Sequence, residues 1–370
     1  MFRQPGPPAQ STSTMTALSR QVRFWGGALL FTSAAVAACA DVPLDAILVP
    51  AGSSGSIAST GAVTSGAASG AAASTGTSGS VANAGSSTGG SAGSMSAVPG
   101  QKRGLAYGGN TYAELLALNN NMMGPVGVSW WQNWTAFPDL SLDGGAYPIE
   151  YVPMVWDTNF TVAGVESQIP PGMTSKYLLT FYLPNVITDA DGKTQSQVTV
   201  ADAVMMWPDI EKIAGDLGLK IVSPSVDYCD PSSEKCLETS PLVWMQDFVE
   251  ACPSCRFDYL GVSSHECDYP SFARDLSVYE RTFPGKPLWI ASFGCTNGTL
   301  DPVQMQQFML SAVYGMENDT QVFRYAWFTG FSKSGDAGAS PYSPYSLLQG
   351  PGSPMLTPLG TAYVNAPVGN

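Results

Sequence analysis

Eight short apolar segments, separated by helix-like segments, dominate the C-terminal part of this chain. Most are continuous apolar runs, which is the pattern of parallel strands that are covered on both faces. Helix-start signals lie between them, such as Thr199 with Asp202 three residues later, and Asp301 before Pro302. The eight strand candidates are 104–109, 127–134, 151–156, 177–183, 220–226, 259–264, 288–293 and 322–328.

This alternation of strands and helices predicts the fold class. Eight strand–helix units over about 260 residues fit a closed (β/α)8 barrel, which typically has about 250 residues. An open doubly wound sheet is the alternative, but no Gly-x-Gly-x-x-Gly turn follows the first candidate strand. We therefore expect an α/β protein with a single (β/α)8 TIM barrel over residues 102–370.

Residues 1–39 have the features of an export signal. Arg20 and Arg23 precede the apolar stretch 24–38, which is too short for a comfortable membrane span. The stretch ends in Val36-Ala-Ala-Cys39, which resembles a bacterial lipobox in which Cys39 would be acylated. Ordinary secretory cleavage, with Cys39 incidental, is the alternative. We expect an exported protein that is lipid-anchored at the cell surface or secreted.

Residues 40–101 separate this signal from the predicted barrel. From Gly52 to Ala97 the chain is almost wholly Gly, Ser, Ala and Thr, with no charged or aromatic residue. Such a segment cannot bury enough apolar surface to offset the entropy that is lost on ordering it. We expect a flexible linker that lets the barrel move at a distance from its anchor.

The charge of the chain narrows the choice of partners. The formal net charge is −13 at pH 7, and no basic run lies beyond the N-terminus. Because nucleic-acid phosphates would be repelled, we expect no nucleic-acid partner. A neutral polysaccharide is compatible with an acidic surface. We further expect no cofactor, a monomer, and contact with a membrane only through the lipid anchor.

The cysteines of the barrel region predict disulfides rather than a metal site. An even number of cysteines in an exported protein favours disulfides. The alternative is a zinc site that would combine Cys252 and Cys255 with His265 and Cys267, but a candidate strand separates the first pair from the second. We expect no metal site and three disulfides: Cys229–Cys236, Cys252–Cys255 and Cys267–Cys295.

Aromatic and polar side chains gather where the candidate strands end. In α/β barrels, function lies at these strand ends and in the loops that follow them. Aromatic rings at one rim suit stacking against the apolar faces of sugar rings, although tryptophans also pack between loops. The candidate substrate-binding residues are Trp131, Trp134, Trp156, Tyr182, Asn185, His265 and Trp327.

Several segments, in order along the chain, resemble glycoside hydrolase family 128. That family contains the catalytic domain named after an alkali-sensitive linkage protein of yeast. The resemblance covers residues 102–366 and implies a TIM barrel that cleaves β-1,3-glucans by a retaining mechanism. The segments that carry it are 102–107, 130–134, 151–156, 178–179, 222–224, 255–258, 286–290, 324–328 and 356–360.

The two glutamates that the family uses in catalysis are both replaced in this chain. The family has Phe-Asn-Glu-Pro-like and Thr-Glu-Phe-like strand ends, where this chain has Phe-Tyr-Leu183-Pro and Ala-Ser292-Phe. Retention requires two carboxyl groups about 5 to 5.5 Å apart. Leucine cannot transfer a proton, and serine is a poor nucleophile without a base. We therefore expect a non-catalytic barrel that binds β-1,3-glucan or a related polysaccharide.

Three alternatives remain open on the sequence alone. Relocated carboxylates, with Glu266, Asp227 and Asp157 as candidates, could restore glucanase activity. Ser292 could act as a nucleophile with His265 as its base, but no Gly-x-Ser-x-Gly turn surrounds it and no third member is identifiable. The barrel could also have lost sugar binding and serve a protein partner at the cell surface.

Overall fold

The computed structural model describes residues 101–119, 127–138, 149–169, 172–173, 175–190, 192–334 and 340–368. The predicted export signal, the lipobox with Cys39 and the predicted linker lie outside these residues. Within the described part, no helix has the length and apolar character that a membrane span needs.

Nine short parallel strands form two sheets. The six-stranded sheet has the order β3-β2-β1-β11-β10-β9, and the three-stranded sheet has the order β4-β5-β7. Their bounds are β1 (Arg103–Ala106), β2 (Trp130–Gln132), β3 (Glu150–Tyr151), β4 (Met154–Val155), β5 (Tyr177–Tyr182), β7 (Lys220–Ser225), β9 (Leu260–Ser264), β10 (Leu288–Phe293) and β11 (Val322–Trp327).

The two sheets are connected at two places. Only Val152 and Pro153 separate β3 from β4, and proline has no N–H with which to continue the ladder. Isolated parallel bridges, Val222 with Tyr259 and Val226 with Val262, join the β7 segment to the β9 segment. Each predicted strand therefore contains observed strand residues, and the parallel α/β architecture is confirmed.

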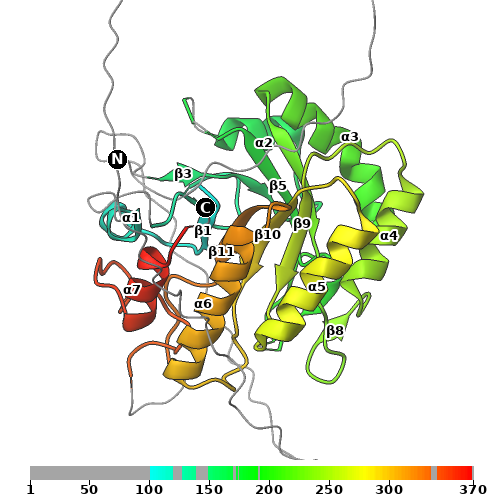
Figure 1. Cartoon of the computed structure of the whole chain (residues 1–370). Helices are drawn as coiled ribbons and strands as arrows, with labels where there is room; N and C mark the ends of the chain where they lie inside the picture. The colour runs from blue at the N-terminus through cyan, green and yellow to red at the C-terminus, as the bar shows by residue number, and fades with distance from the viewer. Residues whose placement is uncertain are drawn as a thin grey trace, which may run out of the picture. The chain divides into compact units, whose positions relative to one another are not determined.

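Helices follow most of these strands, and α5 and α6 lie side by side in front of the sheet (Figure 1). Thr199 caps α3 by accepting a hydrogen bond from the N–H of Asp202, as the sequence predicted, and Asp301 forms a capping box with Gln304. Asp268 caps α5 by accepting a hydrogen bond from the N–H of Ser271. The helices are α1 (Tyr112–Asn119), α2 (Val162–Gln168), α3 (Val200–Leu217), α4 (Pro241–Ala251), α5 (Tyr269–Thr282), α6 (Pro302–Asn318) and α7 (Pro358–Asn365).

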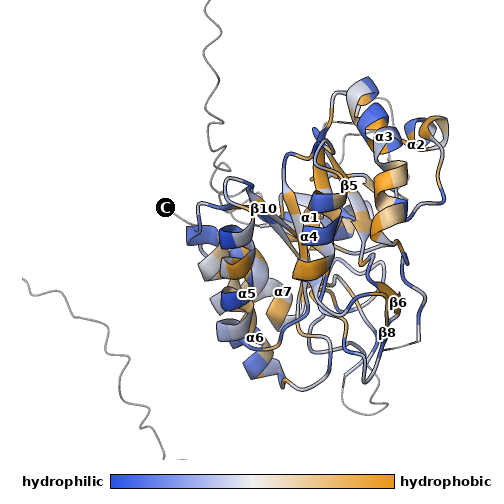
Figure 2. Ribbon diagram, turned by 90° about the vertical axis from the view of Figure 1, so that its right-hand side faces the viewer, coloured by the Kyte–Doolittle hydropathy of each residue, from blue (hydrophilic) through white to orange (hydrophobic). Residues whose placement is uncertain are grey.

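The core has two layers, on opposite faces of the strands. The larger cluster packs the strands against the helices, whose mixed colouring in Figure 2 contrasts with the largely hydrophobic β5. The smaller cluster joins side chains from strands that are far apart in sheet order. In it, the Trp289 ring of β10 lies 5.0 Å from the Trp130 ring of β2 and 5.0 Å from the Tyr177 ring of β5, measured between ring centroids. We call this second layer the inner cluster.

An ion pair lies at one end of the inner cluster. Arg324 of β11 forms a 2.7 Å contact with the carboxylate of Glu150, and its guanidinium lies 4.7 Å from the centroid of the Tyr177 ring. Both partners are largely buried, and the aromatic faces around Arg324 favour the cation. Tyr177 and Arg324 thus occupy the end of the inner cluster near the start of β5, which leaves the strand ends after Tyr182 for a functional site.

All three predicted disulfides are present: Cys229–Cys236, Cys252–Cys255 and Cys267–Cys295. Among the described residues, no group of three or more His, Cys, Asp or Glu side chains is arranged to hold a metal ion. The bridge between Cys267 and Cys295 links the loops that follow β9 and β10, so it fixes two neighbouring strand ends to each other.

Candidate functional site at the strand ends

Hydroxyl groups meet at the ends of the two strands where the sequence resemblance places catalytic carboxylates. The phenol oxygen of Tyr182, at the end of β5, lies 2.8 Å from Oγ of Ser292 in β10. Ser292 in turn donates to Oγ of Ser263 in β9 at 3.4 Å. All three side chains are buried, and burial raises the pKa of Tyr182 above its ordinary value. The strand ends are therefore joined by neutral hydroxyls.

Irregular backbone geometry aims Tyr182 and Leu183 at the inner cluster. The pairing of β5 with β7 shifts register between Thr180 and Tyr182, and a bulge of this kind re-aims the side chains that follow it. Phe181 and Leu183 both have positive φ values, 31° and 47°, a region that L-residues rarely adopt. As a result Phe181 packs toward the helices, whereas Tyr182 and Leu183 join the inner cluster.

Leu183 is half-buried and carries no group that could replace a general acid. Its side chain packs against the inner cluster, as do the rings of Trp134 and Trp156. The backbone N–H of Leu183 donates to the carbonyl of Ser225 at 3.0 Å, which holds the end of β5 against β7. The position expected for an acid/base carboxyl thus contributes only apolar surface.

Three partly exposed aromatic residues, Trp134, Trp156 and Phe328, are connected to the end of the hydroxyl chain at Tyr182. The Trp134 ring lies 6.0 Å from Tyr182 and 5.9 Å from Phe328. Trp156 is joined to this group through its carbonyl, which accepts a hydrogen bond from the N–H of Tyr182 at 3.3 Å. The imidazole of His265 stands edge-on to Phe328 at 5.6 Å. We call Trp134, Trp156, Tyr182, His265 and Phe328 the rim.

Trp131 and Trp327 do not belong to the rim, contrary to the expectation from the sequence. Both side chains are 0% exposed, so neither offers a ring face to a ligand. Successive residues of a strand point to opposite faces, and both of these point to the helix side. Trp131 packs on Tyr151 at 4.8 Å, whereas Trp327 packs on Phe293 at 5.0 Å.

Asn185 is likewise buried, and it connects two loops. Its Nδ2 donates to the carbonyl of Asp227 at 2.7 Å and to the carbonyl of Glu238 at 2.9 Å. These bonds tie the end of β5 to both ends of the loop that follows β7. We therefore assign Asn185 to the support of the site and not to contact with a ligand.

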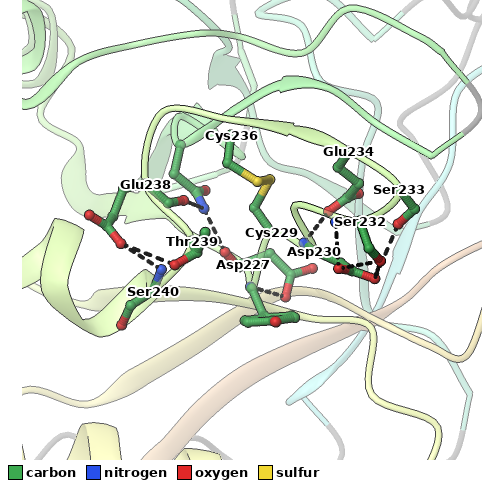
Figure 3. Close-up of a disulfide and its surroundings, with 12 residues drawn as sticks. Asp227, Cys229, Asp230, Ser232, Ser233, Glu234, Cys236, Glu238, Thr239 and Ser240 are labelled. Atoms are coloured by element: carbon green, nitrogen blue, oxygen red, sulfur yellow. Dashed lines mark hydrogen bonds between the residues drawn. A yellow bond between two sulfur atoms is a disulfide. The ribbon is translucent and has the colours of Figure 1, made fainter.

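Asp227 and His265 form a pair that the sequence did not reveal. Oδ2 of Asp227 is hydrogen-bonded to Nδ1 of His265, and Oδ1 accepts from the N–H of Tyr228 at 2.8 Å. Burial disfavours the charged imidazole, but the neighbouring Asp227 carboxylate outweighs burial, so the pKa of His265 is raised above its ordinary value of 6.5. Figure 3 shows Asp227 beside the Cys229–Cys236 disulfide.

The three candidates for relocated catalytic carboxylates, Asp157, Asp227 and Glu266, differ in their surroundings. Asp157 accepts a hydrogen bond from the N–H of Asn159 at 2.8 Å, as a turn residue does. Asp227 and Glu266 both line a cavity of about 360 Å³, together with Asp275 of α5. Burial raises the pKa of Glu266, and the negative charges of Asp275 and Asp227 raise it further. The structure thus brings two of the three candidates to one cavity.

Comparison with known proteins assigns the family. The family model described as "Glycosyl hydrolase catalytic core" matches residues 104–363. A solved endo-β-1,3-glucanase of glycoside hydrolase family 128 (subgroup II), from Sorangium cellulosum, is 33% identical, with a TM-score of 0.59 over 72% of this chain and 99% of that one. This chain belongs to glycoside hydrolase family 128.

Two further solved members of family 128 are similar to this chain. The first is a subgroup II endo-β-1,3-glucanase from Pseudomonas viridiflava, which is 31% identical with a TM-score of 0.57 over 72% of this chain and 98% of that one. The second is a curdlan-specific exo-β-1,3-glucanase of subgroup III from Blastomyces gilchristii, in complex with glucose. It is 26% identical with a TM-score of 0.52 over 71% of this chain and 97% of that one. The search of curated proteins gave no match.

Proposed function

We propose that this protein is a non-catalytic member of family 128 that binds β-1,3-glucan or a related polysaccharide. The observation that carries the proposal is the 2.8 Å contact between Tyr182 and Ser292, across the strand ends where a retaining enzyme of this family needs two carboxyl groups. The Tyr182 ring lies in the inner cluster and its hydroxyl is engaged, so neither side chain is poised to transfer a proton or attack a sugar.

The proposal includes a closed barrel. The two connections between the sheets, at Val152–Pro153 and between β7 and β9, would complete a ring of eight parallel strand positions. Contacts across the inner cluster, such as Trp130 with Trp289, support this closure because β2 and β10 are not neighbours in the sheet. In such a barrel the rim lies at the carboxyl ends of the strands, where ligands bind.

The rim supports sugar binding. Trp134, Trp156 and Phe328 are partly exposed, and aromatic rings stack on the apolar faces of pyranose rings. Loss of the two glutamates removes charge from the centre of the rim but leaves this stacking surface in place. The similar exo-β-1,3-glucanase from Blastomyces gilchristii was solved with glucose, which supports a β-glucan ligand.

An exported location accompanies this function. Three disulfides indicate an oxidising compartment, which agrees with the export signal predicted for residues 1–39. Acylation of Cys39 would anchor the chain, and the linker over 40–101 would let a monomeric barrel reach polysaccharide around the cell. Mass spectrometry of the mature N-terminus tests the anchor: a diacylglyceryl Cys39 supports it, whereas an unmodified N-terminus contradicts it.

Relocated catalysis is less well supported than binding. Both oxygens of the Asp227 carboxylate are engaged, by His265 and by the N–H of Tyr228, so Asp227 is not free to act as a nucleophile. Glu266 lines the cavity beside β9 and is not part of the rim. Glucan hydrolysis that disappears in Glu266→Gln would nevertheless establish this alternative.

Calorimetric titration of the purified chain with laminarihexaose tests binding. We expect a dissociation constant in the micromolar to millimolar range, about −4 to −8 kcal/mol, with little dependence on salt because stacking involves no ion pair. Trp156→Ala should weaken binding and leave the melting temperature nearly unchanged. Tyr314→Ala is the matched control, since Tyr314 lies on α6 and is 68% exposed. Absence of binding heat would favour the protein-partner alternative.

A further inference from the structure

The cavity beside β9 is distinct from the rim and has no role in the function proposed above. Its volume of about 360 Å³ falls at the small end of the range for ligand pockets, about 300 to 1,000 Å³. The end of β9 forms one wall, and α4 and α5 form the others. The exposed ring of Tyr228 lies among its lining residues.

An unpartnered hydroxyl points to a missing ligand at this cavity. Tyr279 of α5 lines the cavity and is 5% exposed, yet its hydroxyl has no hydrogen-bond partner among the described residues. Buried polar groups are nearly always hydrogen-bonded, because leaving one unpaired costs about 1 to 3 kcal/mol. A ligand hydroxyl in the cavity would supply the missing partner.

The polar groups of the lining match a polyhydroxylated ligand. Glu266 and Asp275 offer carboxylate acceptors, and the guanidinium of Arg274, 3.5 Å from the Asp275 carboxylate, offers donors. Sugar hydroxyls can donate to the first two and accept from the third. The apolar side chains of Leu242 and Leu276 complete the lining and suit the C–H faces of a pyranose ring.

Hydrogen bonds connect the cavity lining to the rim, although the two have no residue in common. Ser263, which lines the cavity, accepts the hydrogen bond from Ser292 and so ends the hydroxyl chain that starts at Tyr182. Asp227 also lines the cavity, and it binds His265, whose ring contacts Phe328 of the rim. A single hydrogen bond, between Asp227 and His265, thus connects the cavity lining to the rim.

We infer that this cavity receives a single glucosyl side branch of the polysaccharide whose main chain lies on the rim. The inference rests on the proposed function. Binding of the branch makes the protein selective for branched over linear β-1,3-glucan. The side chains of Tyr279, Glu266 and Asp275 form hydrogen bonds with the branch.

Paired calorimetric titrations test this inference on the full chain. One probe is a linear laminari-oligosaccharide, and the other is the same oligosaccharide with one β-1,6-linked glucosyl branch. We expect the branched probe to bind about five- to tenfold more tightly, as one or two hydrogen bonds of ordinary strength would give. Tyr279→Phe and Glu266→Gln should each reduce this preference and leave the affinity for the linear probe unchanged.

Matched variants and outcomes separate this inference from the proposed function. Tyr279→Phe keeps the ring that packs in the core, and a melting curve verifies that each variant folds. Trp156→Ala, on the rim, should weaken both probes alike. Equal affinities in the unaltered chain, or a preference that survives both cavity variants, would overturn the inference alone. Binding of neither probe would overturn the proposed function and the inference with it.

Discussion

The two sides of the strand-end surface differ in character. Where β5 and β10 end, Tyr182 and Ser292 pair through hydroxyls, and Leu183 adds apolar surface. Where β7 and β9 end, Asp227 and His265 form a hydrogen-bonded pair of ionisable side chains, and Glu266 lines a cavity. The first side therefore presents neutral hydroxyls and apolar surface. The second side carries ionisable groups, and we propose that ligand selectivity resides there.

The largest expected effect on stability comes from removing the disulfide that joins these two sides. Cys267–Cys295 joins the strand end of β9 to that of β10 across 28 residues of sequence. Replacing both cysteines by alanine should cost about 2 to 5 kcal/mol of unfolding free energy, measured by urea denaturation.

The bridge Cys252–Cys255 is the control for this comparison, because it spans only 3 residues. Since the stabilisation by a disulfide increases with the length of the loop that it closes, removal of this bridge should cost less. An equal loss of unfolding free energy in both double replacements would show that Cys267–Cys295 stabilises the fold no more than Cys252–Cys255 does.

The next largest effect on stability is expected where β7 and β9 end. Because the folded-state pKa of His265 is raised, its pair with Asp227 stabilises the fold fully below the unfolded-state value near 6.5. That stabilisation should be lost as the pH rises through the raised pKa. His265→Gln should therefore be less stable than the unaltered chain at pH 5.5, by about 1 to 3 kcal/mol.

The difference in unfolding free energy between His265→Gln and the unaltered chain should decrease as the pH increases above 6.5. Urea denaturation of both proteins at a series of pH values measures it. A gap that is constant, or that widens with increasing pH, would contradict the proposed ion pair.

The smallest effect on stability is expected where β5 and β10 end. Tyr182→Phe removes one neutral hydrogen bond to Ser292 and keeps the ring in the inner cluster. We expect a loss of about 0.5 to 1.5 kcal/mol that does not vary between pH 5.5 and 8. A strong pH dependence of this loss would mean that a charged group, not a neutral hydroxyl chain, occupies this side.

The sequence predicted the scaffold well, because its signals are local. Apolar runs located each parallel strand, and Thr199 and Asp301 located two helix starts. The even number of cysteines, together with the expected export signal, predicted the three disulfides. These patterns depend on neighbours in sequence or on simple pairing, so they survive without knowledge of the tertiary structure.

The site was harder to predict because it depends on which face each strand residue takes. Trp131 and Trp327 lie next to rim-facing positions, and a shift by one residue reverses the face. The register shifts after Thr180 and Ile290 have no clear sequence signal. Phe328, one residue after Trp327, is the ring that reaches the rim.

Contacts between distant residues were also invisible in the sequence. Asp227 and His265 are 38 residues apart, and only the adjacency of the β7 and β9 segments brings them together. The unpartnered hydroxyl of Tyr279 likewise emerges only when α5 is packed against the strands. Asp227 and Glu266 follow predicted strand ends, which marks them as candidates, but the sequence does not show that they line one cavity.

The central claim is that the rim binds β-1,3-glucan without cleaving it. The most direct test titrates the purified chain with laminarihexaose in a calorimeter and then recovers the oligosaccharide from the same cell for chromatography. The account predicts saturable binding heat and recovery of the intact hexasaccharide after prolonged incubation. Shorter laminari-oligosaccharides in the recovered sample, absent when the Glu266→Gln variant is used, would contradict it.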